Sequence, residues 1–262
     1  MEHVTSADGT TIAYERMGRG KPLVLVPGAL CDRNALKPLA VALAGDFDVI
    51  SYDRRGRGES GDSTSYAVER EVDDIAALLA ALGGSAAVYG HSSGAGLTAI
   101  AASSGLLFTE VVLHEPPYGP DDVDSSEDGA RVLQLLQEGR NEEAVQSFLL
   151  MTGMPMSAAV ELAGTPGIAE LAPTLAYDFA VMDYGAPGGR LPTELLARIT
   201  QPTLVLAGTA SPPFMIDAGY RVVKELRAAA LIELADQNHV VPPEFLAPVL
   251  RSFLHGQMVS RR

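Results

Sequence analysis

The chain of 262 residues carries 19 Lys and Arg against 33 Asp and Glu, which gives a formal net charge of −14. This acidic balance argues against nucleic acids and anionic membrane surfaces as partners, because both attract clustered cations. The hydrophobic content of 47% and the charged content of 20% exclude a disordered chain, and the length allows one large domain or one domain with an insertion. Cys31 is the single cysteine, so an internal disulfide and a multi-cysteine metal site are both excluded.

Up to residue 102 the chain alternates apolar runs with helical patterns. It predicts, in order, strands near Val4 and at residues 11–15, 23–26 and 49–52, a helix at 66–82, a strand at 86–89 and a helix of small residues. Residues 85–108 carry no charged side chain and are long enough to cross a bilayer, but their repeated glycines and serines favour a buried strand, turn and helix. The N-terminus has no apolar signal segment, so we expect a soluble, cytoplasmic protein.

The pattern changes after a predicted strand at residues 111–113. Between 117 and 191, helical patterns are separated by Gly and Pro, and no strand is predicted. The remainder predicts a strand at 203–207, a helix at 215–226, a strand at 231–234 and a closing helix whose apolar face is marked by Phe245, Val249 and Phe253. The sequence therefore predicts an α/β fold with a mostly parallel sheet: a core of residues 1–116 and 192–262, interrupted by a helical insertion at 117–191.

The segment Gly90-His91-Ser92-Ser93-Gly94 lies between a predicted strand and a predicted helix. In this setting the pattern G-x-S-x-G indicates a nucleophile elbow, a turn so sharp that side chains in place of the glycines would clash with the neighbouring strand and helix. The serine is then exposed at a helix N-terminus, where the helix dipole favours developing negative charge. Ser92 is therefore the predicted nucleophile.

With this motif in place, the chain resembles the α/β-hydrolase superfamily over essentially its whole length. Residues 23–28 (Leu-Val-Leu-Val-Pro-Gly) are similar to the family's strand and oxyanion turn, although Pro27 stands where a His is common. Residues 53–60 (Asp-Arg-Arg-Gly-Arg-Gly-Glu-Ser) resemble the family's loop D-x-R-G-x-G-x-S, whose arginines are expected to tie loops together at the strand ends. The resemblance implies the α/β-hydrolase fold, with the insertion at 117–191 as a helical cap.

The resemblance also implies the groups that would assist Ser92. A serine hydroxyl is a poor nucleophile until a base takes its proton. His239 lies just beyond the last predicted strand, where the family carries its catalytic histidine. The family's oxyanion hole corresponds to the backbone amides of Ala29 and Ser93, with Leu30 as an alternative to Ala29.

The acid of the expected catalytic triad is missing from its usual place. The family usually carries it in the turn after the strand at 203–207, where this chain has Ser211. Glu115, just after the strand at 111–113, is the first candidate. The chain is similar here to one group of haloalkane dehalogenases, which carry their acid at the end of that strand. Asp217 is a second candidate, and both a Ser–His dyad without an acid and a purely local role for Glu115 stay open.

A serine at the elbow favours acyl transfer, since epoxide hydrolases and haloalkane dehalogenases of this superfamily use an aspartate there. We predict a serine hydrolase that acts on a small, partly apolar carboxylic ester, lactone or thioester through an acyl-enzyme intermediate. A cofactor-free haloperoxidase or perhydrolase, and a hydrolase-fold ligand receptor without turnover, are the alternatives. No cofactor or metal is expected, because no His/Glu cluster has ligand spacing. Substrate identity and oligomeric state are left open.

Overall fold

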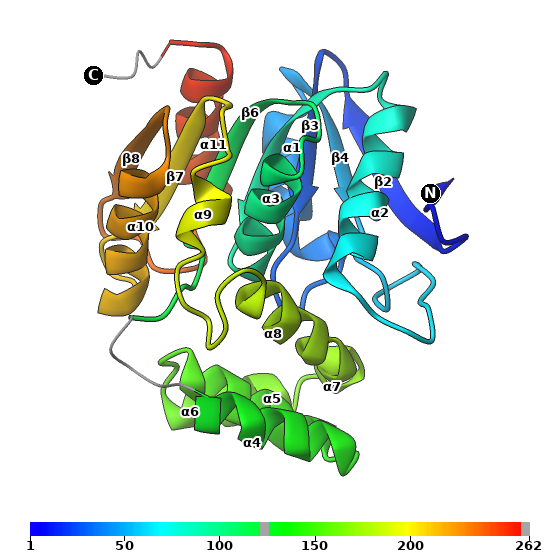
Figure 1. The fold of residues 1–262 in the computed structure, drawn as a ribbon, viewed down its shortest axis with the longest axis vertical. Coiled ribbons are helices and arrows are strands. Elements are labelled where there is room, and N and C mark those ends of the chain that lie inside the picture. Colours follow the sequence, from blue (N-terminus) through cyan, green and yellow to red (C-terminus); the bar gives the residue numbers. More distant parts are fainter. Residues whose placement is uncertain (121–125, 258–262) are drawn as a thin grey trace.

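The computed structural model describes residues 1–120 and 126–257, and an eight-stranded sheet forms its centre (Figure 1). The strands are β1 (Glu2–Thr5), β2 (Thr11–Gly18), β3 (Lys21–Val26), β4 (Phe47–Tyr52), β5 (Ala86–His91), β6 (Phe108–His114), β7 (Thr203–Gly208) and β8 (Ala229–Leu234). Their spatial order is β1-β2-β4-β3-β5-β6-β7-β8. The pairs β1/β2 and β2/β4 are antiparallel and the other pairs are parallel, so the sheet is mostly parallel as predicted.

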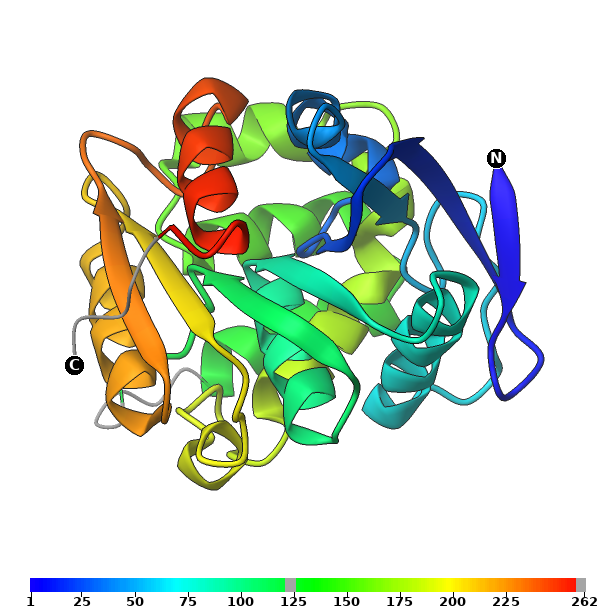
Figure 2. The same cartoon turned by 90° about the horizontal axis from the view of Figure 1, so that it is seen from above.

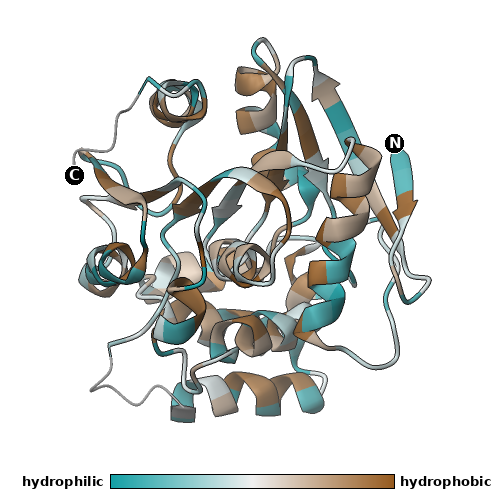
Figure 3. Cartoon of the chain, turned by 45° about the horizontal axis from the view of Figure 1, so that its top comes forward, coloured by the Kyte–Doolittle hydropathy of each residue, from teal (hydrophilic) through white to brown (hydrophobic). Residues whose placement is uncertain are grey.

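Helices cover both faces of this sheet, which Figure 2 shows from above. One face carries η1 (Arg33–Leu36), α1 (Lys37–Leu43) and α11 (Pro243–Leu254), and the other carries α2 (Val68–Ala81), α3 (Ser93–Ser103), α9 (Thr193–Leu196) and α10 (Pro213–Glu225). Side chains of β3 alternate between the two, since Leu23 and Leu25 pack towards α1 and α11 while Val24 and Val26 pack towards α2 and α3. Covered on both faces, the central strands are largely hydrophobic (Figure 3).

The helical insertion lies between β6 and β7. It contains α4 (Ser126–Gln137), α5 (Asn141–Met151), α6 (Met156–Ala163), α7 (Ile168–Leu171), η2 (Ala172–Thr174) and α8 (Leu175–Asp183). Helices α4 to α7 lie below the rest of the molecule in Figure 1, and their apolar side chains form a hydrophobic cluster that also includes Leu30 from the core. Helix α8 faces both ways: Leu175 joins this cluster, whereas Val181 and Met182 pack with α3 in the core. Met182 therefore packs the insertion onto the core.

Two details of the helices differ from the sequence-based expectations. Helix α1 was not predicted, because its seven residues are too few to make a clear periodic pattern. In α11 the buried stripe is Leu246, Leu250 and Leu254, one residue beyond the predicted stripe, and Phe245 is 53% exposed. A shift of one residue rotates a helix face by about 100°. Among the described residues, no helix is long and apolar enough to cross a membrane.

Candidate functional site

Ser92 occupies the sharp turn that the glycine pattern predicts. It links β5 to α3 with φ of 56° and ψ of −128°, a conformation that is costly for a residue with a side chain. A Cβ atom on Gly94 would lie 2.4 Å from the Val26 carbonyl oxygen, and one on Gly90 would lie 2.5 Å from the Gly94 carbonyl oxygen. Only glycine fits these two positions, so the local sequence and the packing of β3, β5 and α3 together hold Ser92 in its strained conformation.

The turn that contains one proposed oxyanion donor borders the Ser92 side chain. Gly28 follows the end of β3 and lies so close that a Cβ atom on it would be 2.9 Å from Ser92 Cβ and 3.5 Å from Ser92 Oγ. The next amide along the chain is that of Ala29. Among the described residues, neither the Ala29 N–H nor the Ser93 N–H donates a hydrogen bond. Both amides are therefore available to a negatively charged oxygen formed at Ser92.

Glu115 and His239 are brought together although 124 residues separate them. Glu115 directly follows β6 with φ of 48°, and its Oε2 lies 2.5 Å from His239 Nδ1. The Gly208 N–H donates to Glu115 Oε1 at 2.6 Å, so both carboxylate oxygens are engaged. Burial would raise the pKa of Glu115, but the hydrogen bond with His239, the nearby Ser211 hydroxyl and the Gly208 amide outweigh it and lower the pKa. The carboxylate is therefore held ionised at Nδ1 of the His239 ring.

The other candidates for the acid position do not reach the imidazole. Ser211, which stands at the family's usual acid position, is buried beside Glu115 without forming a hydrogen bond of normal geometry. The Asp217 side chain is 60% exposed on α10, where it accepts a hydrogen bond from Arg221 Nε at 2.9 Å. Of the two carboxylates considered from the sequence, the structure places Glu115 against His239 and Asp217 on the surface.

His91 and His114 connect the elbow that carries Ser92 with the loop that carries His239. The Ser92 N–H donates to the His114 carbonyl oxygen at 2.9 Å, which fixes the elbow to the end of β6. His91 lies with its ring centroid 4.5 Å from that of His239, and its Nε2 is 2.8 Å from the His239 carbonyl oxygen. Within the described residues no hydrogen bond joins Ser92 Oγ to His239. Catalytic contacts of this kind are often long before substrate binds.

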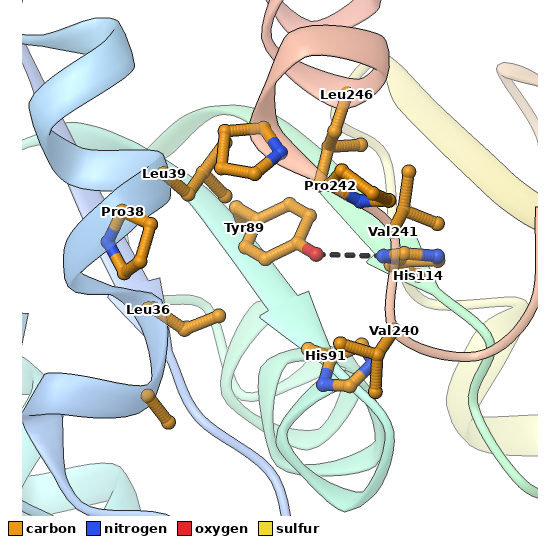
Figure 4. Close-up of a pocket in the computed structure, with 12 residues that line it drawn as sticks. Leu36, Pro38, Leu39, Tyr89, His91, His114, Val240, Val241, Pro242 and Leu246 are labelled. Atoms are coloured by element: carbon orange, nitrogen blue, oxygen red, sulfur yellow. Dashed lines mark hydrogen bonds between the residues drawn. The ribbon is translucent and has the colours of Figure 1, made fainter.

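A cluster of uncharged rings lies behind His239, and we call Tyr89, His91 and His114 the histidine cluster. The Tyr89 hydroxyl is 2.6 Å from His114 Nδ1, and the rings of His91 and His114 are 5.0 Å apart (Figure 4). Burial, and secondarily the neighbouring His239, lowers the pKa of His91 to about 3, and burial lowers that of His114 well below its usual value. These residues line a cavity of about 180 Å³ between α1 and α11. Ser92 does not line it, so this cavity is separate from the proposed acyl site.

A second cluster, of buried charges, lies on the other side of the elbow. We call Arg54, Arg57, Glu71 and Asp178 the charged cluster; each of these residues is at most 3% exposed. Arg54 donates to both oxygens of Glu71 at 2.7 Å, and both arginines donate to Asp178 on α8. These bonds attach the loop at residues 53–60 to helices α2 and α8. Arg57 also donates to the Gly28 carbonyl oxygen, so it ties this loop to the turn after β3, as the resemblance implied.

Sequence reasoning missed the acidic half of the charged cluster and the contacts of His91. A signal existed for Glu71, which lies on the apolar side of its helix between Val68 and Ile75. Asp178 is likewise an acid in an otherwise largely apolar helix. Acids at such positions are rarely buried unless they are paired. No group of three or more His, Cys, Asp or Glu in the described part of the chain is arranged to hold a metal ion.

Comparisons with known proteins agree with the observed fold. Residues 23–249 match the model of the Alpha/beta hydrolase family. The crystal structure of an alpha/beta hydrolase from Sphaerobacter thermophilus is 44% identical, with 97% of this chain and all of that chain covered and a TM-score of 0.90. A thermophilic esterase from Thermogutta terrifontis, solved with malate bound, is 24% identical, with 97% of this chain and 98% of that chain covered and a TM-score of 0.74, which is a likeness of fold.

Among curated proteins, N-formylmaleamate deformylase from Pseudomonas putida is 38% identical over 121 residues, which are 44% of this chain. The match spans less than half of that relative, 45% of its length. The family match extends from β3 to α11 and includes the elbow, the end of β6 and the loop that carries His239. On this evidence of sequence and fold, the chain belongs to the Alpha/beta hydrolase family.

Proposed function

We propose that the protein is a serine hydrolase that transfers an acyl group from a small carboxylic ester, lactone or thioester to Ser92 and then to water. The observation that carries this proposal is the 2.5 Å contact between His239 Nδ1 and Glu115 Oε2. It forms just after the end of β6, to which the strained elbow of Ser92 is hydrogen-bonded. A nucleophile, a base and a group that orients the base are the three parts that acyl transfer needs.

Each step uses a group of this chain. Ser92 Oγ attacks the carbonyl carbon while its proton moves to His239 Nε2. Glu115 accepts a hydrogen bond from the Nδ1–H of His239, which leaves Nε2 free to take the proton and stabilises the imidazolium that forms. The tetrahedral oxyanion accepts hydrogen bonds from the Ala29 and Ser93 amides. His239 then gives the proton to the leaving group, and a water molecule repeats the sequence on the acyl-enzyme.

Amide substrates are a second candidate. The partial similarity to a deformylase supports them, because that relative by its name removes a formyl group from nitrogen. The same Ser92 attack would serve, with His239 protonating a leaving nitrogen in place of an alcohol or thiol. A panel of short esters, lactones, thioesters and formamides, together with a perhydrolysis assay, separates these activities.

We also propose that residues 117–191 act as a cap over a core of residues 1–116 and 192–262. The separate hydrophobic cluster of α4 to α7 supports this division. Leu30, which follows the proposed oxyanion turn, packs in the same cluster, so the cap begins directly beside the reacting atoms. The partner is then a small molecule enclosed between cap and core.

An active-site label tests the proposal. We expect a fluorophosphonate to add one phosphonyl group to the protein, to be lost in Ser92→Ala and retained in the control Ser65→Ala, whose side chain is exposed. Wild-type protein should hydrolyse at least one ester or amide, and Ser92→Ala should lose this activity together with the labelling. Equal labelling of Ser92→Ala would overturn the assignment of the nucleophile. No turnover of any substrate, combined with stabilisation by a ligand, would instead favour a receptor.

A further inference from the structure

Asp178 is a buried carboxylate that the proposed mechanism does not use. It lies on α8 in the insertion and is 3% exposed. Four hydrogen bonds reach it: Ser93 Oγ donates at 2.7 Å, Arg54 Nη1 at 2.7 Å, and Arg57 Nη2 at 3.0 Å to Oδ1 and 2.8 Å to Oδ2. A buried carboxylate persists only when its charge and lone pairs are satisfied, so these bonds hold its partners in fixed directions.

The partners of Asp178 lead to both proposed oxyanion donors. Ser93 carries one of them, its own backbone N–H. Arg57 leads to the other, because its Nη1 donates to the Gly28 carbonyl oxygen at 2.6 Å and to the Cys31 carbonyl oxygen at 3.3 Å. Arg57 therefore spans the turn that contains the Ala29 amide.

Peptide geometry converts the bond to Gly28 into control of Ala29. The Gly28 carbonyl and the Ala29 N–H belong to one planar peptide unit, in which the two bonds point in opposite directions. No cis peptide bond occurs in the described residues. A guanidinium that fixes the direction of the Gly28 carbonyl oxygen thus also fixes the direction of the Ala29 N–H.

We propose that Asp178, although it lies in the cap, is a positioning residue for the oxyanion hole. It orients the Ser93 amide through its hydrogen bond with Ser93 Oγ, and it orients the Ala29 amide through Arg57. This inference rests on the proposed hydrolase function and extends it. Because Asp178 belongs to α8, the amide donors are correctly aimed only when the cap helix is docked on the core.

The same loop provides a matched control. Arg55 donates to both oxygens of Asp74, at 2.8 Å from Nε and 2.7 Å from Nη2, and both side chains are almost completely buried. This ion pair is as buried and as well formed as the one at Asp178. Neither residue forms a hydrogen bond to Ser93 or to the turn at residues 28–31. Asp74→Asn therefore measures the cost of losing a buried ion pair without disturbing the amide donors.

The test compares Asp178→Asn, Ser93→Ala, their double variant and Asp74→Asn. Turnover of p-nitrophenyl acetate gives kcat and KM, and inhibition by a trifluoromethyl ketone, whose adduct with serine carries an oxyanion, reports on the amide donors directly. Because the oxyanion exists only after attack, we expect Asp178→Asn to lower kcat by roughly 10- to 100-fold with KM changed less than about threefold. Affinity for the ketone should fall by the same factor as kcat.

Ser93→Ala should lower kcat by about three- to tenfold, and the double variant should be no worse than Asp178→Asn, because both changes break one chain of contacts. Asp74→Asn should lower the melting temperature but keep kcat and ketone affinity within about threefold of wild type.

If Asp178→Asn does not fold, Ser93→Ala decides: unchanged kcat and ketone affinity overturn the proposal. Equal effects of Asp178→Asn and Asp74→Asn overturn it too. Wild-type protein without Ser92-dependent turnover would overturn the hydrolase function itself, and this inference with it.

Discussion

His91 and Ser93 flank the proposed nucleophile, and their side chains enter two very different regions. His91 joins the histidine cluster on the face of α1 and α11, where the rings are uncharged because burial lowers the pKa of the imidazoles. Ser93 joins the charged cluster on the face of α3 and α8, where two arginines face two carboxylates. The histidine cluster carries no charge, whereas the charged cluster pairs opposite charges.

The difference separates two ways of holding a reactive group. The charged cluster keeps its geometry through directional ion pairs, and Asp178 stays ionised because Arg57 and Arg54 outweigh the effect of burial and lower its pKa. The histidine cluster keeps its geometry through packing and neutral hydrogen bonds, which last only while the imidazoles stay unprotonated. Acid should therefore disturb the His239 side of the site before it disturbs the Ser93 side.

The largest effect is expected on the His239 side, from Glu115→Gln. Glutamine can donate as well as accept, so the imidazole can settle with its proton on the wrong nitrogen, and activity should fall by roughly 10³–10⁴-fold. Asp217→Asn, the matched change of an exposed carboxylate, should be nearly silent. Steady-state kinetics on the ester found in the panel, with circular dichroism to verify folding, measures both. Small and equal effects would leave a Ser–His dyad.

On the Ser93 side, Gly94→Ala should have the next largest effect. The added methyl group would lie 2.4 Å from the Val26 carbonyl oxygen and 2.6 Å from that of Pro27, so α3 must move away from the end of β3. We expect a loss of about 1–3 kcal/mol in the free energy of unfolding and at least tenfold in kcat. Gly45→Ala is the control, because a Cβ atom there meets nothing within 4 Å. Equal melting temperatures of the two variants would contradict the packing argument.

The pH dependence of stability distinguishes the two clusters. His91 and His114 have folded-state pKa values below 6.5, so the unfolded chain binds their protons first. Their stabilising contribution is therefore complete above about pH 6.5 and decreases as the pH falls, by up to about 1.4 kcal/mol per pH unit for each histidine. The lowered pKa of Glu115 acts in another window, since its contribution is lost only below pH 4.5.

Urea unfolding between pH 7.5 and 5.0 measures this slope. His91→Asn should remove part of it, while His3→Asn, a change at an exposed position of β1, should leave it intact. If the free energy of unfolding of the wild-type protein does not change over this range, then protonation of the histidine cluster does not destabilise the fold. The two sides of the elbow would then not differ as described.

The smallest effect concerns Cys31, beside the charged cluster. Burial raises the pKa of its thiol to about 11, and the opposing influence of Arg57 is smaller. At pH 8 about one thiol in a thousand would be ionised, so alkylation by iodoacetamide should be about 100-fold slower than for a free cysteine. The rate should keep rising up to pH 10. A plateau near pH 8.5 would mean that the arginines act on Cys31 as unpaired positive charges.

The sequence by itself was sufficient for the elements that depend on neighbours in the chain. The strands around the elbow, the helical insertion and the position of Ser92 follow from apolar periodicity and from two glycines within five residues. A turn of this kind is a local conformation, so a short stretch of residues encodes it. The closing helix was also predicted, but its buried stripe was one residue out, because the neighbours of α11 decide which side is covered.

The tertiary structure alone decided which distant side chains meet. From the sequence, the partner of His239 stayed open between Glu115, Asp217 and no acid, and the role of Asp178 had no visible motif. The contacts of Glu115 with His239 and of Ser93 with Asp178 span 124 and 85 residues. Such pairs depend on strand order and on the docking of α8. Many weak packing contacts spread along the chain determine both, so no short run of residues encodes them.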